Sequence, residues 1–437
     1  MFLKGIAFGI AMLLMFSCSN KEKVYHIPAA WEHQDALWLG WEADTSYGYQ
    51  SVLVSIIKSI SHKVQVNLAV ESDSLMHQAS QYLTSKGINL ETIHFQIIKG
   101  SQFWIRDFGA QFLVNDLGEL AIVDFIFNGY GYPEFLKRQF GDNPQIKSVL
   151  DAMELKVKET NKVSSLIAES QKAAIIKTKI VQEGGGTEAN GKGSLILCEA
   201  TVLDRNPGST KKVIESEFKK VLGVSNIIWL KKGLLEDPLH CFRRIHQNYI
   251  ACGTGGHTDS FVRFVDENTI FIAWIDESEI NGNPILQINH DRMKENFEIL
   301  EKAVDQDGRP FNIIKVPMPD LISRKLIANC DLQSQIEKNN ISCQGLIPSE
   351  MPQHGDTLIQ VANASYLNFV ITNGMILLPT YTHMGSSKSK EELVRLIFKI
   401  EFPHSQIVFI DAMPLNWKGG GLHCLTMEQP GKSKYLP

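Results

Sequence analysis

The sequence lacks the short motifs that mark several common protein classes. It contains neither the glycine fingerprint of a dinucleotide-binding fold nor a P-loop, so nothing indicates a nucleotide cofactor. None of its 7 cysteines is spaced as CxxC, which excludes a zinc ribbon and a thioredoxin-type motif. The net charge of −5 gives no reason to expect a nucleic acid as a partner.

The residues that are present predict one large α/β domain. Hydrophobic residues make up 44% of the 437 residues and charged residues 21%, which is enough to build a full core. Short runs with strand periodicity alternate with helical runs, and a lysine-rich helical segment fills roughly 134–174. We therefore expect an α/β fold and a single domain over residues 25–437.

The first residues predict an export signal that is not part of the fold. Lys4 precedes an apolar run over 5–16, which is shorter than the about 20 residues of a membrane-spanning helix. Ser17 and Cys18 follow, so 1–18 looks like a bacterial lipoprotein signal, with Cys18 lipidated and 19–24 as a short tether. We expect an exported lipoprotein, periplasmic or at the cell surface, that meets the membrane only through this anchor. A secreted protein with a plain signal is the alternative.

The stretch from Trp417 to Cys424 predicts a nucleophile. Its three consecutive glycines, 419–421, allow the backbone to approach a ligand closely, and little bulk surrounds the cysteine behind them. A thiol has an ordinary pKa of about 8.5, so a reactive Cys424 needs a cationic or hydrogen-bonding neighbour. His423 would face the other way in a strand, so we expect that neighbour from elsewhere in the chain. A buried cysteine after a glycine-rich hairpin is the plainer alternative.

Whether the remaining cysteines form disulfides depends on the compartment in which the protein folds. If Cys18 is lipidated and Cys424 is reactive, an odd number is left, which cannot all pair within the chain. These are Cys198, Cys241, Cys252, Cys330 and Cys343. An exported protein could carry a disulfide such as Cys241 with Cys252, but the sequence leaves the connectivity open.

Three other glycine-marked turns carry ionisable residues ahead of predicted strands. Asp107 stands near Trp104, where a carboxylate beside an aromatic face suits a planar cation; a surface ion pair of Arg106 and Asp107 is the alternative. Glu183 opens a second triple glycine, and His257 with Asp259 follows a third glycine-rich turn. In a strand, His257 and Asp259 would leave the same face and address one ligand, although a histidine satisfied within the core is also common.

Equivalent turns that converge at one end of a repeated α/β architecture would bring these side chains together. The resulting site has a thiol nucleophile, a histidine acid/base and several carboxylates, with no evident cofactor. Such a set suits attack on the central carbon of a guanidinium group that carboxylates hold by paired hydrogen bonds.

Several short motifs occur in a fixed order from about residue 25 to 430. They are Pro28-Ala-Ala-Trp31-Glu, Trp104-Ile-Arg-Asp107-Phe-Gly109, Glu183-Gly-Gly-Gly186, Asn190-Gly-Lys-Gly193, Asn206-Pro, Gly256-His257-Thr-Asp259, Tyr366-Leu-Asn368-Phe, Asn373, Pro379-Thr-Tyr381 and Gly419-Gly-Gly-Leu-His-Cys424-Leu-Thr. In this order they resemble the bacterial-type peptidylarginine deiminase and agmatine deiminase family, guanidine-modifying enzymes of the pentein superfamily.

The resemblance implies a five-bladed, pseudo-symmetric α/β propeller with a central active site and a hydrolysis without a metal or other cofactor. On the matching positions, Cys424 is the catalytic nucleophile, His257 the general acid/base, and Asp107 and Asp259 the clamp for the guanidinium, which also raises the proton affinity of His257. The residues implied to contact substrate are Trp104, Arg106 and Glu183. Agmatine or peptidylarginine would become a ureido product plus ammonia through a covalent thiouronium on Cys424.

Departures from the family leave the far end of the substrate open. Phe127-Asn-Gly-Tyr-Gly-Tyr132-Pro stands where the agmatine branch has a phenylalanine-asparagine-alanine-tryptophan-glycine-glycine run, and Tyr381-Thr-His-Met384-Gly lacks that branch's aspartate. The segment 238–255 is extra sequence, in which Arg243 and Arg244 are either surface charges or receptors for a carboxylate. Agmatine and peptidylarginine stay equally open as substrates.

Two other classes of function remain open. In one, a zinc ion on four side chains makes the protein a metallohydrolase. Those side chains are His257, Asp259, His423 and Cys424. In the other, a surface lipoprotein binds guanidinium ligands without turnover.

Overall fold

The computed structural model describes residues 23–42, 48–141, 144–332, 336–337, 339–342 and 347–431. The predicted signal with Cys18, most of the tether and Cys343 lie outside these ranges, so the predictions for them stay predictions. In the ranges described, no helix is long and apolar enough to cross a membrane.

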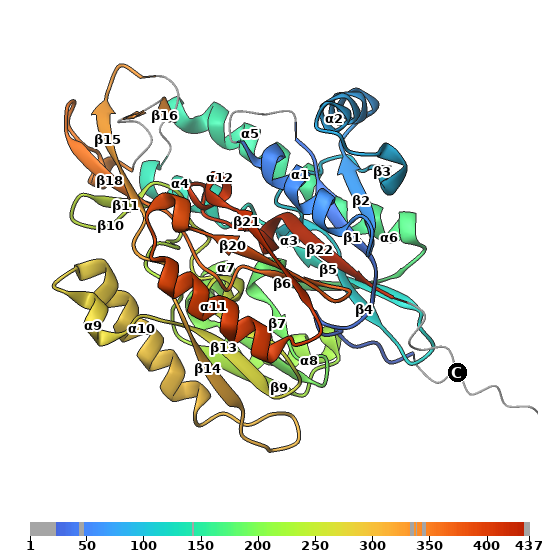
Figure 1. Ribbon diagram of the computed structural model, residues 1–437. Coiled ribbons are helices and arrows are strands. Elements are labelled where there is room, and N and C mark those ends of the chain that lie inside the picture. Colours follow the sequence, from blue (N-terminus) through green and yellow to red (C-terminus); the bar gives the residue numbers. More distant parts are fainter. Residues whose placement is uncertain are drawn as a thin grey trace, which may run out of the picture.

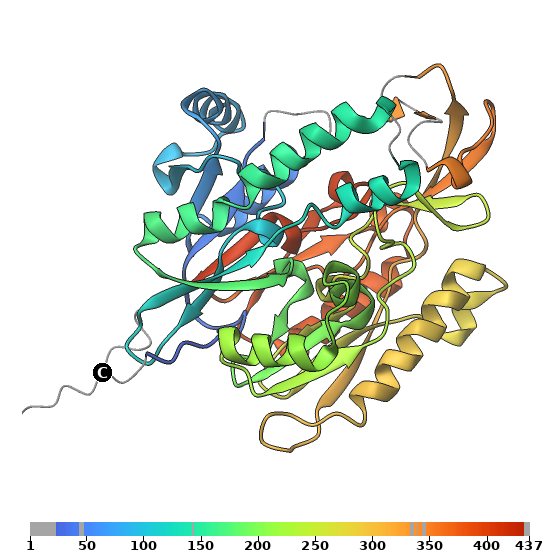
Figure 2. The ribbon, with the colours of Figure 1, turned by 180° about the vertical axis from the view of Figure 1, so that it is seen from behind.

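The chain has a mixed α/β fold in which five small sheets repeat one pairing pattern within the part described (Figures 1 and 2). In each, a first strand runs antiparallel to a central strand, which is parallel to a third. Four of them, in chain order, are β4 (Gln111–Val114), β5 (Leu120–Ile126) and β6 (Ala174–Val181); β7 (Glu188–Ala189), β8 (Ser194–Cys198) and β9 (Asn226–Leu230); β12 (Val262–Phe264), β13 (Thr269–Trp274) and β14 (Asn312–Pro317); and β19 (Val370–Thr372), β20 (Met375–Thr380) and β21 (Gln406–Asp411). The fifth is β22 (Thr426–Pro430), β1 (Gln34–Gly40), β2 (Gln65–Val70) and β3 (Ile93–Ile97).

The two ends of the described chain meet in the fifth sheet. The last strand, β22, pairs antiparallel with the first strand, β1, and places Trp38 opposite Met427. The buried Trp38 indole donates a hydrogen bond to Gln429 Oε1 at 2.8 Å, which satisfies its N–H away from water. The repeated pattern therefore closes on itself, and the segment just before β22 lies next to the segments before the other first strands.

Helices connect and cover the sheets because a parallel strand pair needs a crossover. The helices are α1 (Tyr49–Ile60), α2 (Asp73–Ser85), α3 (Ile105–Phe108), α4 (Tyr132–Phe140), α5 (Pro144–Thr160), α6 (Val163–Gln171), α7 (Glu199–Arg205), α8 (Lys211–Leu222), α9 (Glu277–Ile280), α10 (Pro284–Leu300), α11 (Lys388–Glu401) and α12 (Met413–Asn416). Helix α8 is an example: Ile214, Phe218, Val221 and Leu222 recur at helical spacing and bury one face against strands of the first and second sheets.

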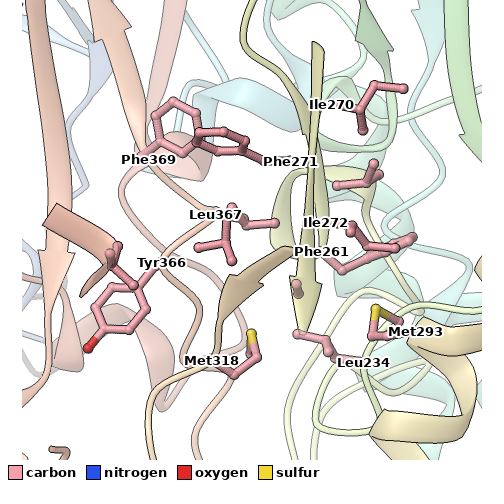
Figure 3. Packing of buried hydrophobic residues seen from close by; sticks show 14 of the residues in the cluster. Leu234, Phe261, Ile270, Phe271, Ile272, Met293, Met318, Tyr366, Leu367 and Phe369 are labelled. Carbon is pink, nitrogen blue, oxygen red and sulfur yellow. The ribbon is translucent and has the colours of Figure 1, made fainter. Parts of the chain in front are cut away.

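Aromatic and branched side chains from neighbouring sheets form the largest buried cluster. Figure 3 shows Phe271 of β13 and Phe369 from the turn before β19 side by side, with Tyr366 and Leu367 on the same side. The rings of Phe369 and Phe398 of α11 meet edge to face with centroids 4.8 Å apart. This packing fixes the turn that precedes β19 relative to the third sheet.

An additional sheet stands out from this body at one side (Figures 1 and 2). Its strands are β10 (Arg243–His246), β11 (Tyr249–Ala251), β15 (Ser323–Asn329), β16 (Ile336–Glu337), β17 (Asn340–Ser342) and β18 (Thr357–Val361). The extra segment 238–255 supplies its hairpin, and Cys241 forms a disulfide with Cys252, as the sequence had allowed. Cys198 and Cys424 are free and buried.

Some predicted elements differ in the structure. The apolar run from Ser194 predicts a strand to residue 203, but the strand ends at Cys198, because α7 begins at Glu199. Asp107 lies in the short helix α3 ahead of β4. His257 and Asp259 lie at a 3₁₀ turn over Thr258–Ser260 and not in a strand as expected. The lysine-rich segment of roughly 134–174 is helical as predicted, but it is divided into α4, α5 and α6.

Candidate active site

Five turns, each just before the first strand of a sheet, bring their polar side chains to one place. The residues that they contribute, in order of the sheets they precede, are Asp107, Glu183, His257 with Asp259, Asn368, and Cys424. All of these side chains are buried. The convergence expected from the glycine-marked turns is therefore present, with Asn368 as an addition.

Cys424 lies on a single 3₁₀ turn, His423–Leu425, directly before β22. Its thiol is 3.6 Å from Asp259 Oδ2, and it accepts hydrogen bonds from Asn368 Nδ2 at 3.4 Å and from the Gly421 N–H at 3.5 Å. Burial, together with the charges of Asp259 and Asp107, raises the pKa of the Cys424 thiol well above its ordinary value. Without a cation in the site, the thiol is therefore protonated at neutral pH.

His257 is held between carboxylates. Its Nε2 lies 3.4 Å from Glu183 Oε2, and its Nδ1 lies 3.6 Å from Asp107 Oδ1. Burial works against a charge on this ring, but the carboxylates of Asp107, Glu183 and Asp259 outweigh it and raise the pKa of His257 to about 9. His257 is thus an imidazolium at neutral pH. Within the described residues its Nδ1 has no hydrogen-bond partner, which leaves this N–H available to a substrate.

Asp107 is fixed by two donors from different parts of the chain. The Gly185 N–H donates to Oδ1 at 3.1 Å, and the Tyr130 hydroxyl donates to Oδ2 at 2.9 Å. Burial raises the pKa of the Asp107 carboxyl, while the positive charge of His257 and these donors oppose the rise. A carboxylate has about four acceptor positions, so Asp107 can still receive a guanidinium N–H.

Asp259 is oriented by the residue next to the nucleophile. His423 Nδ1 lies 2.8 Å from Asp259 Oδ2, and the His423 N–H donates to Asn368 Oδ1 at 2.9 Å. Burial raises the pKa of Asp259 to about 6, whereas burial and the charges of Arg106 and Arg263 lower the pKa of His423 well below its ordinary value. A neutral His423 therefore donates to an ionised Asp259 at neutral pH.

The Glu183 carboxylate contacts both His257 and a buried arginine. Arg205 Nε donates to Glu183 Oε1 at 2.7 Å, and both side chains are almost wholly buried. Burial alone would raise the pKa of Glu183, but Arg205 and His257 lower it to about 2. Glu183 is therefore permanently ionised and acts on His257.

Asp237 fixes the backbone of the His257 turn. Its carboxylate accepts hydrogen bonds from the N–H groups of Thr254, of Gly256 at 2.9 Å and of His257 at 3.0 Å. Thr254 lies near the end of the extra segment 238–255, which the disulfide between Cys241 and Cys252 closes. Asp237, the residue before this segment, is therefore joined to the turn that follows it.

A family model identifies the group of proteins with this arrangement. The model for Porphyromonas-type peptidyl-arginine deiminase matches residues 26–430. The chain belongs to this deiminase family. It is a hydrolase of the agmatine and peptidylarginine deiminase type, which acts on a guanidino group.

Relatives of this deiminase agree with the assignment over nearly its whole length. Agmatine deiminase of Pseudomonas syringae pv. tomato is 28% identical over 420 residues, 94% of this chain and 96% of that protein. Agmatine deiminase of Pseudomonas putida is 27% identical over the same span. Among solved structures, agmatine deiminase of Enterococcus faecalis superposes with a TM-score of 0.68 at 22% identity, covering 93% of this chain and 96% of the other. The mixed α/β fold is therefore that of the agmatine deiminases.

The three residues that the resemblance implies to contact substrate each have different neighbours in the structure of the deiminase. The Trp104 ring lies against the nucleophile loop, since a Cβ on Gly420 would come within 2.5 Å of it. Arg106 points to Glu428, with Nη2 2.7 Å from Oε2, and donates from Nε to the His423 carbonyl at 3.3 Å. Arg106 thus supports the turn of Cys424, and Glu183 contacts His257 and Arg205; contact of these residues with substrate stays a prediction.

Four contributors to the deiminase site were not predicted as site residues. They are Tyr130, Arg205, Asp237 and Asn368. Asn368 could have been found from the sequence, because it stands before a strand within one of the matched motifs, but no glycine marks its turn. The other three contact residues that only the fold brings close, for example Tyr130 with Asp107 at a separation of 23 residues and Arg205 with Glu183 at 22.

The side chains that the zinc hypothesis assigns as metal ligands lie near one another in the deiminase, but Asp259 already contacts both His423 and Cys424. Asp259 accepts from His423 and lies beside the Cys424 thiol. In the described part of the chain, no group of three or more His, Cys, Asp or Glu side chains is arranged to hold a metal ion.

Proposed function

We propose that this deiminase hydrolyses a guanidinium substrate, agmatine first and peptidylarginine second, to a ureido product and ammonia through a thiouronium on Cys424. The observation that carries the proposal is the convergence of a thiol, an imidazolium and two carboxylates. Asp259 Oδ2 lies 3.6 Å from Cys424 Sγ, and Asp107 Oδ1 lies 3.6 Å from His257 Nδ1. Carboxylates on both sides of the thiol and the imidazole suit a planar cation that must present its carbon to sulfur.

The architecture that supports this site is, in our proposal, a five-bladed pseudo-symmetric propeller. Two observations favour it. The five sheets repeat the same strand order, and the last strand of the described chain completes the sheet that contains the first. In such an arrangement the turns before the first strands all face the central axis, which accounts for the position of the site residues.

The substrate itself activates the nucleophile. Burial and the negative charges of Asp259 and Asp107 keep the thiol of Cys424 protonated in the empty site. A bound guanidinium cancels those charges and lowers the pKa of the thiol, because an opposite charge nearby favours the thiolate. Asp259, within 3.6 Å of the sulfur, accepts the thiol proton. The nucleophile is therefore formed when a cation of the right shape is in place.

His257 acts first as an acid and then as a base. The thiolate adds to the guanidinium carbon, and His257 gives its Nδ1 proton to the departing nitrogen, which leaves as ammonia. The neutral imidazole then takes a proton from water, whose oxygen attacks the thiouronium carbon. When the carbon–sulfur bond breaks, the hydroxyl of the adduct loses its proton to solvent and the ureido product leaves, while Asp259 returns its proton to the Cys424 sulfur.

Agmatine is placed first because the arginines of the extra segment are already occupied. Arg243 makes paired hydrogen bonds with Glu350, with Nη2 2.7 Å from Oε1. Arg244 donates to the Glu350 and Gln247 carbonyls at 2.8 and 3.0 Å. Neither guanidinium is free to receive the carboxylate of a C-terminal peptidylarginine, whereas agmatine has none.

We also propose that the protein is an exported lipoprotein with Cys18 as its anchor. The disulfide between Cys241 and Cys252 supports an oxidising compartment. Labelling of growing cells with a fatty-acid analogue tests this: the full chain should take up label and fractionate with membranes, and Cys18→Ala should abolish both. A protein that stays unlabelled in the cytoplasmic fraction would contradict the proposal.

The test of the reaction is release of ammonia and a ureido product by protein lacking residues 1–18. The substrates are agmatine, free arginine, and peptides with C-terminal or internal arginine. We expect turnover of agmatine, a covalent adduct on Cys424 detectable by mass spectrometry, and a rate unaffected by chelators. Stoichiometric zinc with activity lost to a chelator would favour the metallohydrolase. Ligand binding without product would favour the binding protein.

A further inference from the structure

The extra segment 238–255 has no part in the proposed chemistry, yet it packs beside the active site. It begins directly after Asp237 and ends directly before Gly256, and its hairpin lies next to α4 (Figures 1 and 2). Within it, His240 is buried, with its ring centroid 4.3 Å from that of Phe135 and 5.2 Å from that of Tyr132. The insertion therefore packs on the first turn of α4.

The turn that leads into α4 has an uncommon backbone. Gly129, Tyr130 and Gly131 have φ values of 68°, 59° and 71°. The left-handed region suits glycine but is unfavourable for a tyrosine, so Tyr130 needs contacts that hold it there. The Gly131 N–H donates to Asn128 Oδ1 at 2.7 Å, and His240 Cε1 would lie 3.9 Å from a Cβ on Gly131. His240 thus supports the end of this turn.

The same turn delivers a hydroxyl to the active site. Tyr130 donates to Asp107 Oδ2 at 2.9 Å, and its ring centroid is 6.4 Å from that of His257. Burial and the nearby carboxylates raise the pKa of Tyr130 well above its ordinary value, so the phenol stays a donor. With the Gly185 N–H on the other oxygen, Tyr130 sets the orientation of the Asp107 carboxylate.

The insertion is itself anchored at several points. Cys241, next to His240, is disulfide-bonded to Cys252. The Arg243 guanidinium lies 4.9 Å from the centroid of Phe135, and Ile347, from the segment that follows β17, joins the buried cluster of Phe135 and Leu136 on α4. The insertion and Ile347 therefore both pack against α4.

We propose that Tyr130 is a positioning residue for the guanidinium-binding carboxylate of Asp107, and that the disulfide-bonded insertion 238–255 braces Tyr130 through His240. This inference rests on the proposed function and assigns a role to the segment that departs from the family. It states that the insertion acts on substrate binding from outside the site, through the turn 128–131.

A double-mutant cycle on agmatine turnover tests the brace. Tyr130→Phe keeps the ring and removes the donor, and we expect kcat/KM to fall about tenfold, mainly through KM, which is the usual cost of one hydrogen bond to a charged group. His240→Ala should lower kcat/KM by a smaller factor in the same direction. Because His240 acts through Tyr130, the double variant should equal Tyr130→Phe alone. If the losses in kcat/KM of the two single variants multiply in the double variant, His240 does not act through Tyr130 and the proposal is overturned.

The pH profile separates positioning from a general loss of structure. Asp107 is faced by Tyr130, His257, Glu183, Asp259 and Cys424. Asp107 and Asp259 must both be ionised to hold the guanidinium, and removing the phenol donor raises the pKa of Asp107, so the acid limb of kcat/KM should move to higher pH in Tyr130→Phe. His246→Ala, the same residue type at the end of β10 opposite to Arg243, should leave both the profile and kcat/KM unchanged. An unmoved acid limb in Tyr130→Phe would overturn the positioning role.

A measurement without turnover keeps this inference apart from the proposed reaction. Chloroacetamidine, a planar cation, and neutral chloroacetamide both alkylate a thiol, forming a carbon–sulfur bond and releasing chloride. The rate ratio at the Cys424 peptide, read by mass spectrometry, reports the carboxylate clamp. We expect a clear preference for the cation that falls in Tyr130→Phe, in His240→Ala and in the variant with Cys241→Ser and Cys252→Ser. A preference without hydrolysis of any substrate would refute only the reaction, and equal ratios in all variants would refute the brace.

Discussion

Arg205 Nε lies 2.7 Å from Glu183 Oε1, and neither side chain of this ion pair is reached by solvent. Arg205 also donates to Asp204 Oδ2 at 2.8 Å and to the Thr254 carbonyl at 2.7 Å. The pair therefore ties α7, the second triple glycine and the turn of the acid/base residue together. It also keeps Glu183 charged, and this charge helps to keep His257 protonated.

Removing one partner of this pair should be costly. Arg205→Met leaves the buried Glu183 carboxylate with only His257 as a cationic partner, so we expect a loss of about 3–5 kcal/mol in the free energy of unfolding, measured by denaturant titration. Arg395→Met removes an exposed pair with Glu392 on α11 and should cost less than about 1 kcal/mol. Combining Arg205→Met with Glu183→Gln should recover part of the loss. No recovery would show that packing, not charge, dominates at this site.

The two free cysteines should differ in their importance to turnover. Cys424→Ser replaces the proposed nucleophile by a much weaker one, so we expect kcat to fall at least about 1,000-fold. The covalent adduct detected by mass spectrometry should also disappear. Cys198→Ser is the matched control, since Cys198 is equally buried but lies beside the Lys231 carbonyl and not at the site. It should keep its kcat. Equal losses in the two variants would argue against Cys424 as the nucleophile.

The pH dependence of kcat/KM should be bell-shaped. Asp259 has its pKa raised to about 6 and must be ionised to bind the guanidinium, so activity should fall as pH drops below about 6. His257 has its pKa raised to about 9 and must be protonated to release ammonia, so activity should fall as pH rises above about 9. Ammonia release across this range measures both limbs. A basic limb near the ordinary pKa of histidine, about 6.5, would show that the carboxylates do not act on His257 as described.

A methyl group on Gly185 should interfere with the acid/base residue directly. A Cβ there would lie 2.6 Å from His257 Nδ1 and 2.9 Å from Asp107 Oδ1, closer than real contacts allow. We expect Gly185→Ala to lower kcat about 100-fold or more, because small displacements of catalytic groups are that costly.

The control for this glycine is one with free space around it. A Cβ on Gly308 would meet nothing within 4 Å, although the residue has a φ of 82°. Gly308→Ala should lower the melting temperature slightly through backbone strain and leave kcat unchanged. If Gly185→Ala also kept its kcat, His257 Nδ1 could not be the proton donor to the leaving nitrogen.

Much of the local structure could be predicted because periodicity is a local property. The strand expected at Gln111–Val114 is β4, and the helix expected from Asp73 to Lys86 is α2, Asp73–Ser85. Where a strand changes directly into a helix, as at Cys198, the apolar run continues and gives no sign of the change. The two-residue spacing of His257 and Asp259 predicted one common ligand from strand geometry, while the structure brings the two together through a 3₁₀ turn.

The sequence by itself determined which residues are candidates for the chemistry, namely a cysteine behind three glycines and a histidine and carboxylates at turns, and it determined the order of motifs that marks the family. Residue type and short spacing decide these, and both are visible in one dimension. Only the tertiary structure decided which partners complete the site. His423 faces Asp259, Arg106 turns to Glu428, and Tyr130 reaches Asp107. These contacts depend on how five turns from distant parts of the chain meet, and burial together with the carboxylates gathered there sets the pKa values of His257 and Cys424.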